Sequence, residues 1–275
     1  MTTQSVPRTP SITGPSLVSP LSPGAALRLL VLRNYIVYRD AWKLFLTGFL
    51  EPVLYLLSIG IGVGSLITTF EFNGEAIPYA EFVAPGMLAA SAMNGALMDS
   101  TFNVFFKLKY IKLYDQMLAT PLSTTDIARG EIAWGQLRGS SYSAMFLVVM
   151  AAMGLTHSWW ALLALPAALL IGFAFSAVCM ALTTYMKSWQ DFDKITLVQL
   201  PLFLFSATFF PITAFPEPVR WFVELTPLYR GVVLCRELTT GALSWGSAVS
   251  VVYLLAMGLV GLMVVRRRLD SLLLT

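Results

Sequence analysis

The chain has 275 residues, of which 57% are hydrophobic and only 12% are charged, with a formal net charge of +3 at pH 7. Soluble domains carry about 25% charged residues, so this composition excludes an ordinary soluble enzyme. The sequence predicts an all-α membrane protein with several transmembrane helices, whose function is transport or chemistry within the membrane.

Residues 1–25 are rich in Pro, Ser and Thr and have no signal-peptide core, so a flexible, uncleaved cytoplasmic tail is expected. Residues 26–43 follow a helical pattern, with cations on one arc beside an aromatic stripe. The residues of this pattern include Arg28, Arg33, Arg39, Lys43, Tyr35, Tyr38 and Trp42. It is either a helix in the inner membrane interface, facing anionic lipid or a partner, or a simple basic segment before the first span.

Apolar stretches of membrane-crossing length recur along the rest of the chain. We predict six transmembrane helices, over residues 44–66, 82–106, 131–155, 160–186, 195–210 and 247–265. The fifth is short and runs into a proline-rich stretch, residues 211–218. It is therefore expected to stop before crossing fully or to bend near its outer end.

The basic residues predict the orientation of these helices. Fifteen of the 18 Lys and Arg residues lie on one side, including Arg266, Arg267 and Arg268 after the last span, and three lie on the other. Lys and Arg resist translocation, so both termini are predicted to be cytoplasmic, in the bacterial plasma membrane.

Three charged residues lie inside the first three predicted helices. Glu51, Asp99 and Arg138 are each seven residues from the inner end of their span, about 10 Å into the membrane. We predict that they face one another. Nearby polar residues are Tyr55, Asn94 and Asn103. Two interpretations remain open: an ion pair that holds three helices together, or direct contact with a substrate.

The connection between the second and third spans predicts a short amphipathic helix that continues the second span and ends at Thr120 and Pro121. Its residues include Lys107, Lys109, Tyr110, Lys112, Tyr114, Asp115, Met117 and Leu118. Ser123 and Asp126 then match the start signal of the next helix. Such a helix, turn and helix on the cytoplasmic side can insert into a groove of a partner protein.

The segment before the last span is broken by prolines and rich in aromatic residues, so we expect short pieces that cap a pathway in the outer leaflet. Its charged residues are Glu217, Arg220, Glu224, Arg230 and Glu237. They either pair with one another, ring an exit, or are the solvated faces of two short helices.

Motifs of soluble enzymes are absent: there is no phosphate-binding Gly-rich loop with a Lys, no HExxH and no GxSxG. The lone His157 and the pair Cys179 and Cys235 do not form a metal site. No catalytic residue, metal site or ATP site is predicted in this chain.

Several stretches resemble the membrane subunits of type-2 ABC exporters. They are EPVLYLL (51–57), FVAPGML (82–88), YDQMLATPLS (114–123) followed by Asp126 and Glu131, and LTPLY (225–229). The likeness covers about residues 26–268, and within the family it is greatest to the nodulation protein J and daunorubicin-resistance permeases. Residues 269–275 would form a cytoplasmic C-terminal tail.

The resemblance implies a six-helix half-transporter that dimerises and works with two copies of a separate ATPase, which binds the ATP and Mg. It implies a connecting helix over 26–43, a re-entrant hairpin over 206–238 and a coupling helix over 110–123. The implied coupling residues are Tyr110, Tyr114, Asp115, Met117, Leu118, Pro121, Leu122 and Asp126. The implied external gate residues are Phe210, Pro211, Phe215, Glu217, Glu224, Pro227 and Tyr229.

The expected function is therefore that of a permease subunit that exports an amphipathic substrate, such as a drug, a glycolipid or a lipooligosaccharide. Its expected partners are the ATPase, a second permease chain and membrane lipids, and not nucleic acid. A secondary transporter would carry its coupling charges through the bilayer centre. A membrane-embedded lipid-modifying enzyme, the other alternative, would use Glu51 or Asp99 as a base.

Overall fold

The computed structural model describes residues 21–39, 42–66, 70–72, 75–156 and 158–273. Most of the predicted tail, Asp40 and His157 lie outside the described residues, as do the side chains of Trp42, Lys43 and Glu51. The segment predicted to reach a partner, residues 107–126, is described in full.

The described residues are mainly helical, as predicted. The helices are α1 (Pro23–Tyr38), α2 (Trp42–Leu66), α3 (Tyr79–Met98), α4 (Leu113–Leu118), α5 (Thr124–Ala152), α6 (Ala164–Thr183), α7 (Asp191–Leu204), α8 (Glu217–Leu225), α9 (Pro227–Thr240) and α10 (Trp245–Leu273). Two π-helical segments, η2 (Asp99–Asn103) and η3 (Phe106–Tyr110), prolong α3, and two 3₁₀ turns are η4 (Trp159–Leu163) and η5 (Ile212–Ala214). An antiparallel hairpin of β1 (Phe70–Phe72) and β2 (Glu75–Ile77) was not predicted from the sequence.

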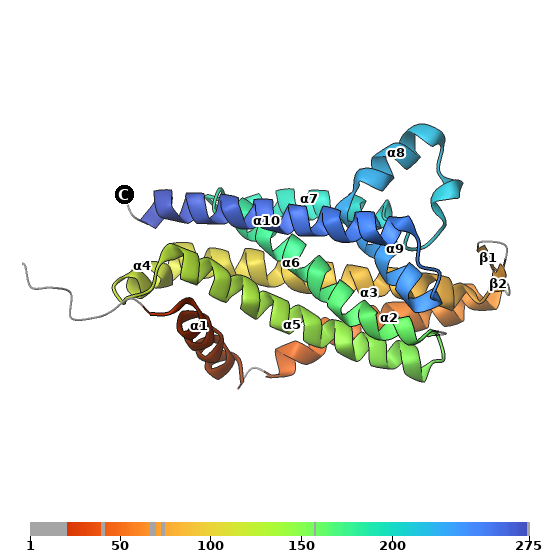
Figure 1. Cartoon of the computed structure of the whole chain (residues 1–275), viewed down its shortest axis with the longest axis horizontal. Helices are drawn as coiled ribbons and strands as arrows, with labels where there is room; N and C mark the ends of the chain where they lie inside the picture. The colour runs from red at the N-terminus through yellow and green to blue at the C-terminus, as the bar shows by residue number, and fades with distance from the viewer. Residues whose placement is uncertain (1–20, 40–41, 67–69, 73–74, 157, 274–275) are drawn as a thin grey trace, which may run out of the picture.

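The long helices run along one direction and separate the chain into two ends (Figure 1). The turn around α4 and the C-terminus lie at one end, with α1 crossing the bundle beside them. The hairpin β1–β2, α8 and α9 lie at the other end. The basic segments around α4 and at the end of α10 therefore share one end, as the predicted orientation requires.

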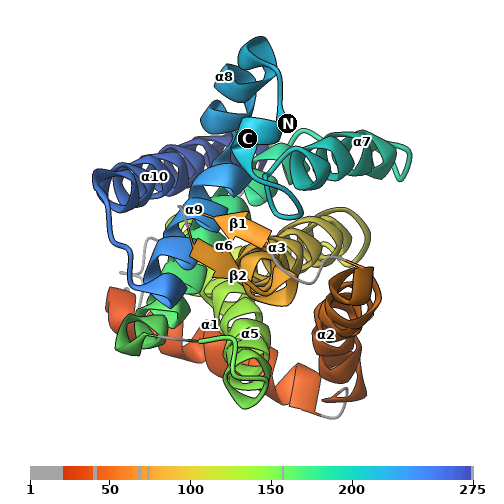
Figure 2. The same cartoon turned by 90° about the vertical axis from the view of Figure 1, so that its right-hand side faces the viewer.

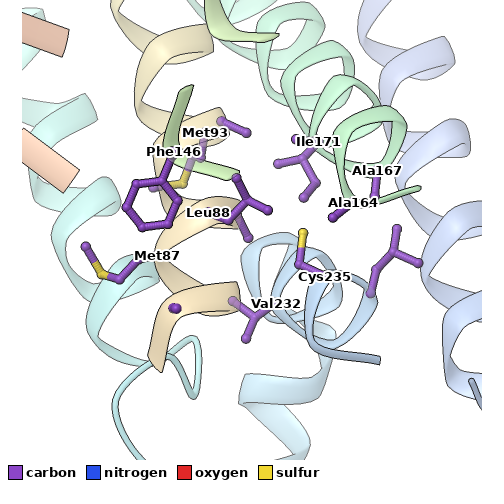
Figure 3. Close-up of a cluster of buried hydrophobic side chains, with 14 of the residues drawn as sticks. Met87, Leu88, Met93, Phe146, Ala164, Ala167, Ile171, Val232 and Cys235 are labelled. Carbon is purple, nitrogen blue, oxygen red and sulfur yellow. The ribbon is translucent and has the colours of Figure 1, made fainter. Parts of the chain in front are cut away.

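The main core joins α3, α6 and α9 at the end away from α4. Leu88 and Met93 of α3 meet Ile171 of α6 and Val232 and Cys235 of α9 (Figure 3). Small residues let these helices approach: a Cβ added to Gly231 would lie 2.9 Å from Cδ1 of Ile171. The described fold is thus held by helix packing and not by a disulfide, since Cys179 and Cys235 are both free and buried.

Helices α6 and α10 pack closely along their length. A Cβ on Gly261 would lie 2.8 Å from the carbonyl carbon of Ala177, and a Cβ on Gly258 would lie 2.3 Å from Phe173 Cε1. Small residues at helix contacts are what allows helices in a membrane to gain packing energy, because lipid supplies no hydrophobic driving force between them.

The predicted boundaries are wrong in three places. Helix α1 ends at Tyr38, five residues before the predicted end at residue 43. Helix α10 continues to Leu273, so most of the predicted C-terminal tail is helical, with Leu269 buried. Helix α7 has only 14 residues and ends at Leu204, six before the predicted end at residue 210.

Fewer helices meet a criterion of length and composition for crossing a membrane than were predicted as spans. Among the described residues, two helical segments, Trp159–Thr183 and Trp245–Leu273, are long and apolar enough to cross a membrane by length and composition. At 14 residues, α7 is about 21 Å long, shorter than the hydrocarbon layer of about 30 Å. The expectation of a fifth span that stops early therefore agrees with the length of α7.

The contact between α6 and α10 can be tested at its glycines. Replacing Gly261 by Val should destabilise the protein by about 1–3 kcal/mol, because the added atoms meet the α6 backbone. The unfolding temperature of the purified protein in detergent is the measurement. Gly172→Val on α6 is the control, since no heavy atom lies within 4 Å of a Cβ there. Equal losses from the two variants would contradict this packing.

Candidate functional site

The segment predicted to reach a partner is a separate short helix. The prolonged α3 ends at Tyr110, and Lys112 adopts a left-handed backbone conformation with φ of 49°. A non-glycine residue with this φ interrupts a right-handed helix. The prediction that the amphipathic helix continues the second span is therefore wrong: α4 begins anew at Leu113 and changes direction.

Helix α4 is held against the bundle by its inner face. Tyr114 and Met117 are buried in a cluster that includes Leu30 of α1, Ile127 of α5 and Leu269 of α10. Burial raises the pKa of Tyr114 well above its ordinary value. These two predicted coupling residues therefore position α4 and do not offer their side chains to a partner.

The outer face of the same turn is accessible. Asp115 and Pro121 are exposed, Tyr110 is 55% exposed, and Leu118, Leu122 and Asp126 are partly exposed. The turn ends at the predicted capping box: the Asp126 backbone N–H donates to Ser123 Oγ, and the Ser123 backbone N–H donates to Asp126 Oδ2, each at 3.1 Å. The adjacent Thr124 hydroxyl donates to Asp270, which joins α5 to the end of α10.

A buried ion pair lies directly behind this turn. Lys107 Nζ lies 2.7 Å from Glu131 Oε2 and 3.4 Å from Asn34 Oδ1, and all three residues are buried. The pair joins the prolonged α3 to α5, and the contact between Lys107 and Asn34 also links α1 to α3. It was not predicted from the sequence, although Lys107 and Glu131 stand at facing ends of two consecutive predicted spans and so share a depth in an antiparallel pair.

The predicted contact between Asp99 and Arg138 is present about two helical turns deeper. Arg138 Nη1 donates to Asp99 Oδ1 at 2.6 Å, and Asn103 Nδ2 donates to the same oxygen at 2.5 Å. Arg138 also donates to the Tyr142 hydroxyl at 2.8 Å and lies 5.5 Å from the ring centre of Tyr38. Tyr38 of the expected interfacial helix is partly buried, and its ring centre also lies 5.5 Å from that of Trp134.

Tyr55 and Asn94 of the predicted polar cluster are not at this ion pair. Glu51 lies on α2 with its side chain outside the described structure. Tyr55 and Asn94 line a different cavity of about 230 Å³ between α2, α3 and α7, together with Gln199. Gln199 Nε2 donates to Asn94 Oδ1 at 2.9 Å. The structure thus separates a buried ion pair from an uncharged polar cavity.

The exposed and buried faces of α1 agree in part with those expected of a helix in the membrane interface. Its buried face consists of Ala26, Leu30 and Asn34, and a Cβ on Gly130 of α5 would lie 2.7 Å from Leu30 Cβ. Arg28, Tyr35 and Arg39 are exposed, and Arg33 is partly exposed. Leu29, Leu32, Ile36 and Val37 are exposed as well, so an apolar face remains available for lipid.

The predicted external gate is divided between a largely non-helical segment packed on α3 and the helices α8 and α9. Ser206, Ala207 and Thr208 are buried after the end of α7, and a Cβ on Gly86 of α3 would lie 2.8 Å from Thr208 Cγ2. Non-helical backbone at membrane depth requires such burial. Phe210 and Phe215 are in edge contact at 5.0 Å, whereas Glu217 is exposed and Pro211, Glu224, Pro227 and Tyr229 are partly exposed.

The charged residues of this region do not pair with one another in the described structure. Arg220 donates to the carbonyl oxygens of Phe215 and Thr213, and Glu237 accepts from Ser244. Of the three alternatives for these five residues, mutual ion pairing is therefore the one that the described structure does not favour.

Arg236, which was not singled out from the sequence, is buried under this segment. Its Nη2 lies 3.0 Å from the Ala207 carbonyl oxygen and 3.3 Å from that of Phe82, and its guanidinium lies 4.0 Å from the Phe82 ring centre. It therefore links α9, α3 and the segment after α7. No local signal in the sequence marks it, because its burial depends on the distant segments that cover it.

Comparison with known proteins shows a family to which the sequence is similar. The sequence model of the ABC-2 type transporter family matches residues 25–240. Nodulation protein J of Rhizobium leguminosarum bv. trifolii is 33% identical over 224 residues, which cover 80% of this chain and 84% of that relative. Nodulation protein J of Rhizobium meliloti is 28% identical over 76% of this chain and 79% of that relative. The inner membrane transport permease YadH of Escherichia coli is 23% identical over 68% of this chain and 73% of that relative.

A structural role of the ion pair between Asp99 and Arg138 can be distinguished experimentally from a substrate-binding role. Arg138→Met leaves the buried Asp99 carboxylate without this cation and should cost about 3–5 kcal/mol of stability. Adding Asp99→Asn should restore the unfolding temperature in detergent. Lys194→Met, which removes an exposed cation beside Asp191, is the control and should cost at most about 1 kcal/mol.

The double variant also decides between the two roles. If it is stable and still moves cargo, the pair only holds helices together. If it is stable and inactive, the pair contacts cargo. A double variant as unstable as Arg138→Met would contradict the structural account.

Proposed function

The chain belongs to the ABC-2 type transporter family, and we propose that it is the six-helix, ATP-coupled permease of an exporter for an amphipathic substrate. The family's permeases lack an ATPase domain, so this chain is a transport subunit and the family implies a separate ABC ATPase partner. Two ATPase copies and a second permease chain, in the first instance an identical one, complete the proposed assembly. The family is one of inner membrane transport permeases.

The observation that carries the proposal is the rigid attachment of the α4 turn. Tyr114 and Met117 fix α4 to α1, α5 and α10, and the pair of Lys107 and Glu131 fixes the two helices that flank it. A turn that is exposed on one side and tied to three long helices on the other can transmit movement of a partner into the bundle. We infer that the ATPase binds the face of the turn that carries Asp115, Pro121 and Leu122. In this proposal the turn and both termini lie on the cytoplasmic side.

Helix α7 is the element suited to move when the ATPase moves α4. It is short, and the segment that follows it is packed on α3 beside Arg236. In the proposed cycle, closure of the two ATPase copies moves α4, shifts α2 and α7, and opens a path below the cap formed by residues 205–215. Phe210, Phe215 and Tyr229 lie along that cap and remain the proposed external gate.

The cavity beside α7 supports an amphipathic substrate. It offers Tyr55, Ser91, Asn94 and Gln199 as uncharged hydrogen-bonding groups, with Phe203 as an apolar wall. Such a surface suits a neutral polar group attached to a hydrophobic one, as in a drug, a glycolipid or a lipooligosaccharide, better than a small ion. The alternative of a lipid-modifying enzyme that uses Asp99 as its base is disfavoured, because that carboxylate already accepts from Arg138 and Asn103.

Single cysteines test both the partner and the orientation. With the two native cysteines replaced by Ala, Pro121→Cys should crosslink to the cognate ATPase and be unreactive toward an impermeant maleimide in intact spheroplasts. Ala242→Cys is exposed in the connection between α9 and α10, which lies at the opposite end of the bundle, and should show the reverse behaviour. Labelling of Pro121→Cys from outside, or cargo movement by reconstituted permease driven by a proton gradient without ATPase, would refute the proposal.

A further inference from the structure

A long apolar groove separates α7 from the rest of the bundle. It has a volume of about 510 Å³ and lies between α7 on one side and α3, α6 and α10 on the other. Figure 2 shows α7 and α10 toward two sides of the bundle, with α6 nearer its centre. Val178 and Leu182 of α6, Met257 of α10, and Val198 and Leu202 of α7 form its walls.

The groove differs from the polar cavity described above, which lies on another face of α7. Thr196, Leu200 and Phe203 line the polar cavity, whereas Ile195, Val198 and Leu202 line the groove, and Gln199 borders both. The apolar groove walls cannot bind water well, and an empty space of this size forfeits contact energy. An occupant must therefore be hydrocarbon, and the volume lies within the usual range of about 300–1000 Å³ for ligand sites.

One end of the groove carries its charged lining residues, with Arg268 beside them. Tyr185, Asp191 and Lys194 line this end, and the Arg268 guanidinium lies 4.1 Å from the Tyr185 ring centre. The Nε atom of Arg268 is buried and makes no hydrogen bond within the described structure. The opposite end is lined by Pro227 and has no cation among its lining residues.

The carboxylate of Asp191, at this end of the groove, already accepts hydrogen bonds. Asp191 Oδ1 accepts from Lys194 at 2.6 Å, and Oδ2 accepts from the backbone N–H groups of Lys187 and Ser188. These hydrogen bonds lower the pKa of Asp191 below its usual range. Arg268 and the exposed Lys187 are then the cations available to an anionic group.

We propose that this groove binds one acyl chain of an anionic phospholipid, with its phosphate at Arg268 and Lys187. The ligand is a bound lipid and not the exported cargo, and the site stands whether or not the proposed transport path is correct. Charge at one end, hydrocarbon walls behind it and a neighbouring Trp189 match a phospholipid at a membrane surface. The lipid then fills the space behind α7 and supports it.

Native mass spectrometry of the purified full-length protein tests the site with dioleoyl phosphatidylglycerol and dioleoyl phosphatidylcholine. The unmodified protein should bind phosphatidylglycerol about five-fold or more tightly than phosphatidylcholine, the effect of one cation near a lipid phosphate. Arg268→Gln should remove this preference, and Arg268→Lys should keep most of it. Arg266→Gln is the matched control, because two residues along a helix place it on the opposite face.

A second variant tests the groove itself. Val178→Trp should fill it and abolish retention of both lipids, whereas Val252→Trp, on a lipid-exposed position of α10 outside the groove, should not. Equal binding of the two lipids by the unmodified protein, or undiminished retention by a folded Val178→Trp protein, would overturn the proposal. So would an efficient disulfide between Val198→Cys residues of two chains, because a second copy would then occupy the groove.

Discussion

The constraint on which the structure depends is that a charge buried among membrane helices needs a partner. Two ion pairs meet this need, Lys107 with Glu131 and Asp99 with Arg138, and both join the prolonged α3 to α5. Because the pairs lie about two helical turns apart on both helices, they define the antiparallel register of these helices. A slip by one residue would break both pairs. The short connection that carries α4 is therefore held between two helices that cannot slide past each other without exposing buried charge to hydrocarbon.

This arrangement divides the bundle into a part that is held firmly and a part that is not. Helices α3, α5, α6 and α10 share ion pairs and close contacts at glycine residues. Helix α7 contacts α3 through the hydrogen bond between Gln199 and Asn94, and its buried Phe192 packs against Phe102 and Phe105, with ring centres 4.2 and 5.1 Å apart. The groove lies along its other side. Displacing the part of α7 after Phe192 would therefore cost less packing energy than displacing α5, which would break buried ion pairs. The part of α7 next to the polar cavity is thus held less firmly than the rest of the bundle.

Much of this architecture could be predicted from local sequence, and the failures have a common cause. Capping at Ser123 and Asp126 is a property of a few neighbouring residues, and it is present as predicted. The depth of Asp99 and Arg138 could be counted along two consecutive helices, and their contact could be predicted from it. Burial of Tyr114, the partial burial of Tyr38 and the position of Arg236 depend on which distant helix covers each residue. Periodicity within one helix does not show which distant helix covers a residue. The continuation of α10 to Leu273 likewise depends on its contact with α5.

On the proposal that a lipid fills the groove, the two faces of α7 connect that lipid to the polar cavity. With the groove filled, Val198 and Leu202 would have neighbours, and α7 would be held toward Asn94 of α3, beside the polar cavity. Without the lipid, α7 would have room to move into the groove and away from that cavity. A ligand shifts such an equilibrium only by its difference in affinity for the two arrangements. Since the lipid occupies space that α7 would otherwise take, the geometry of the groove itself supplies that difference.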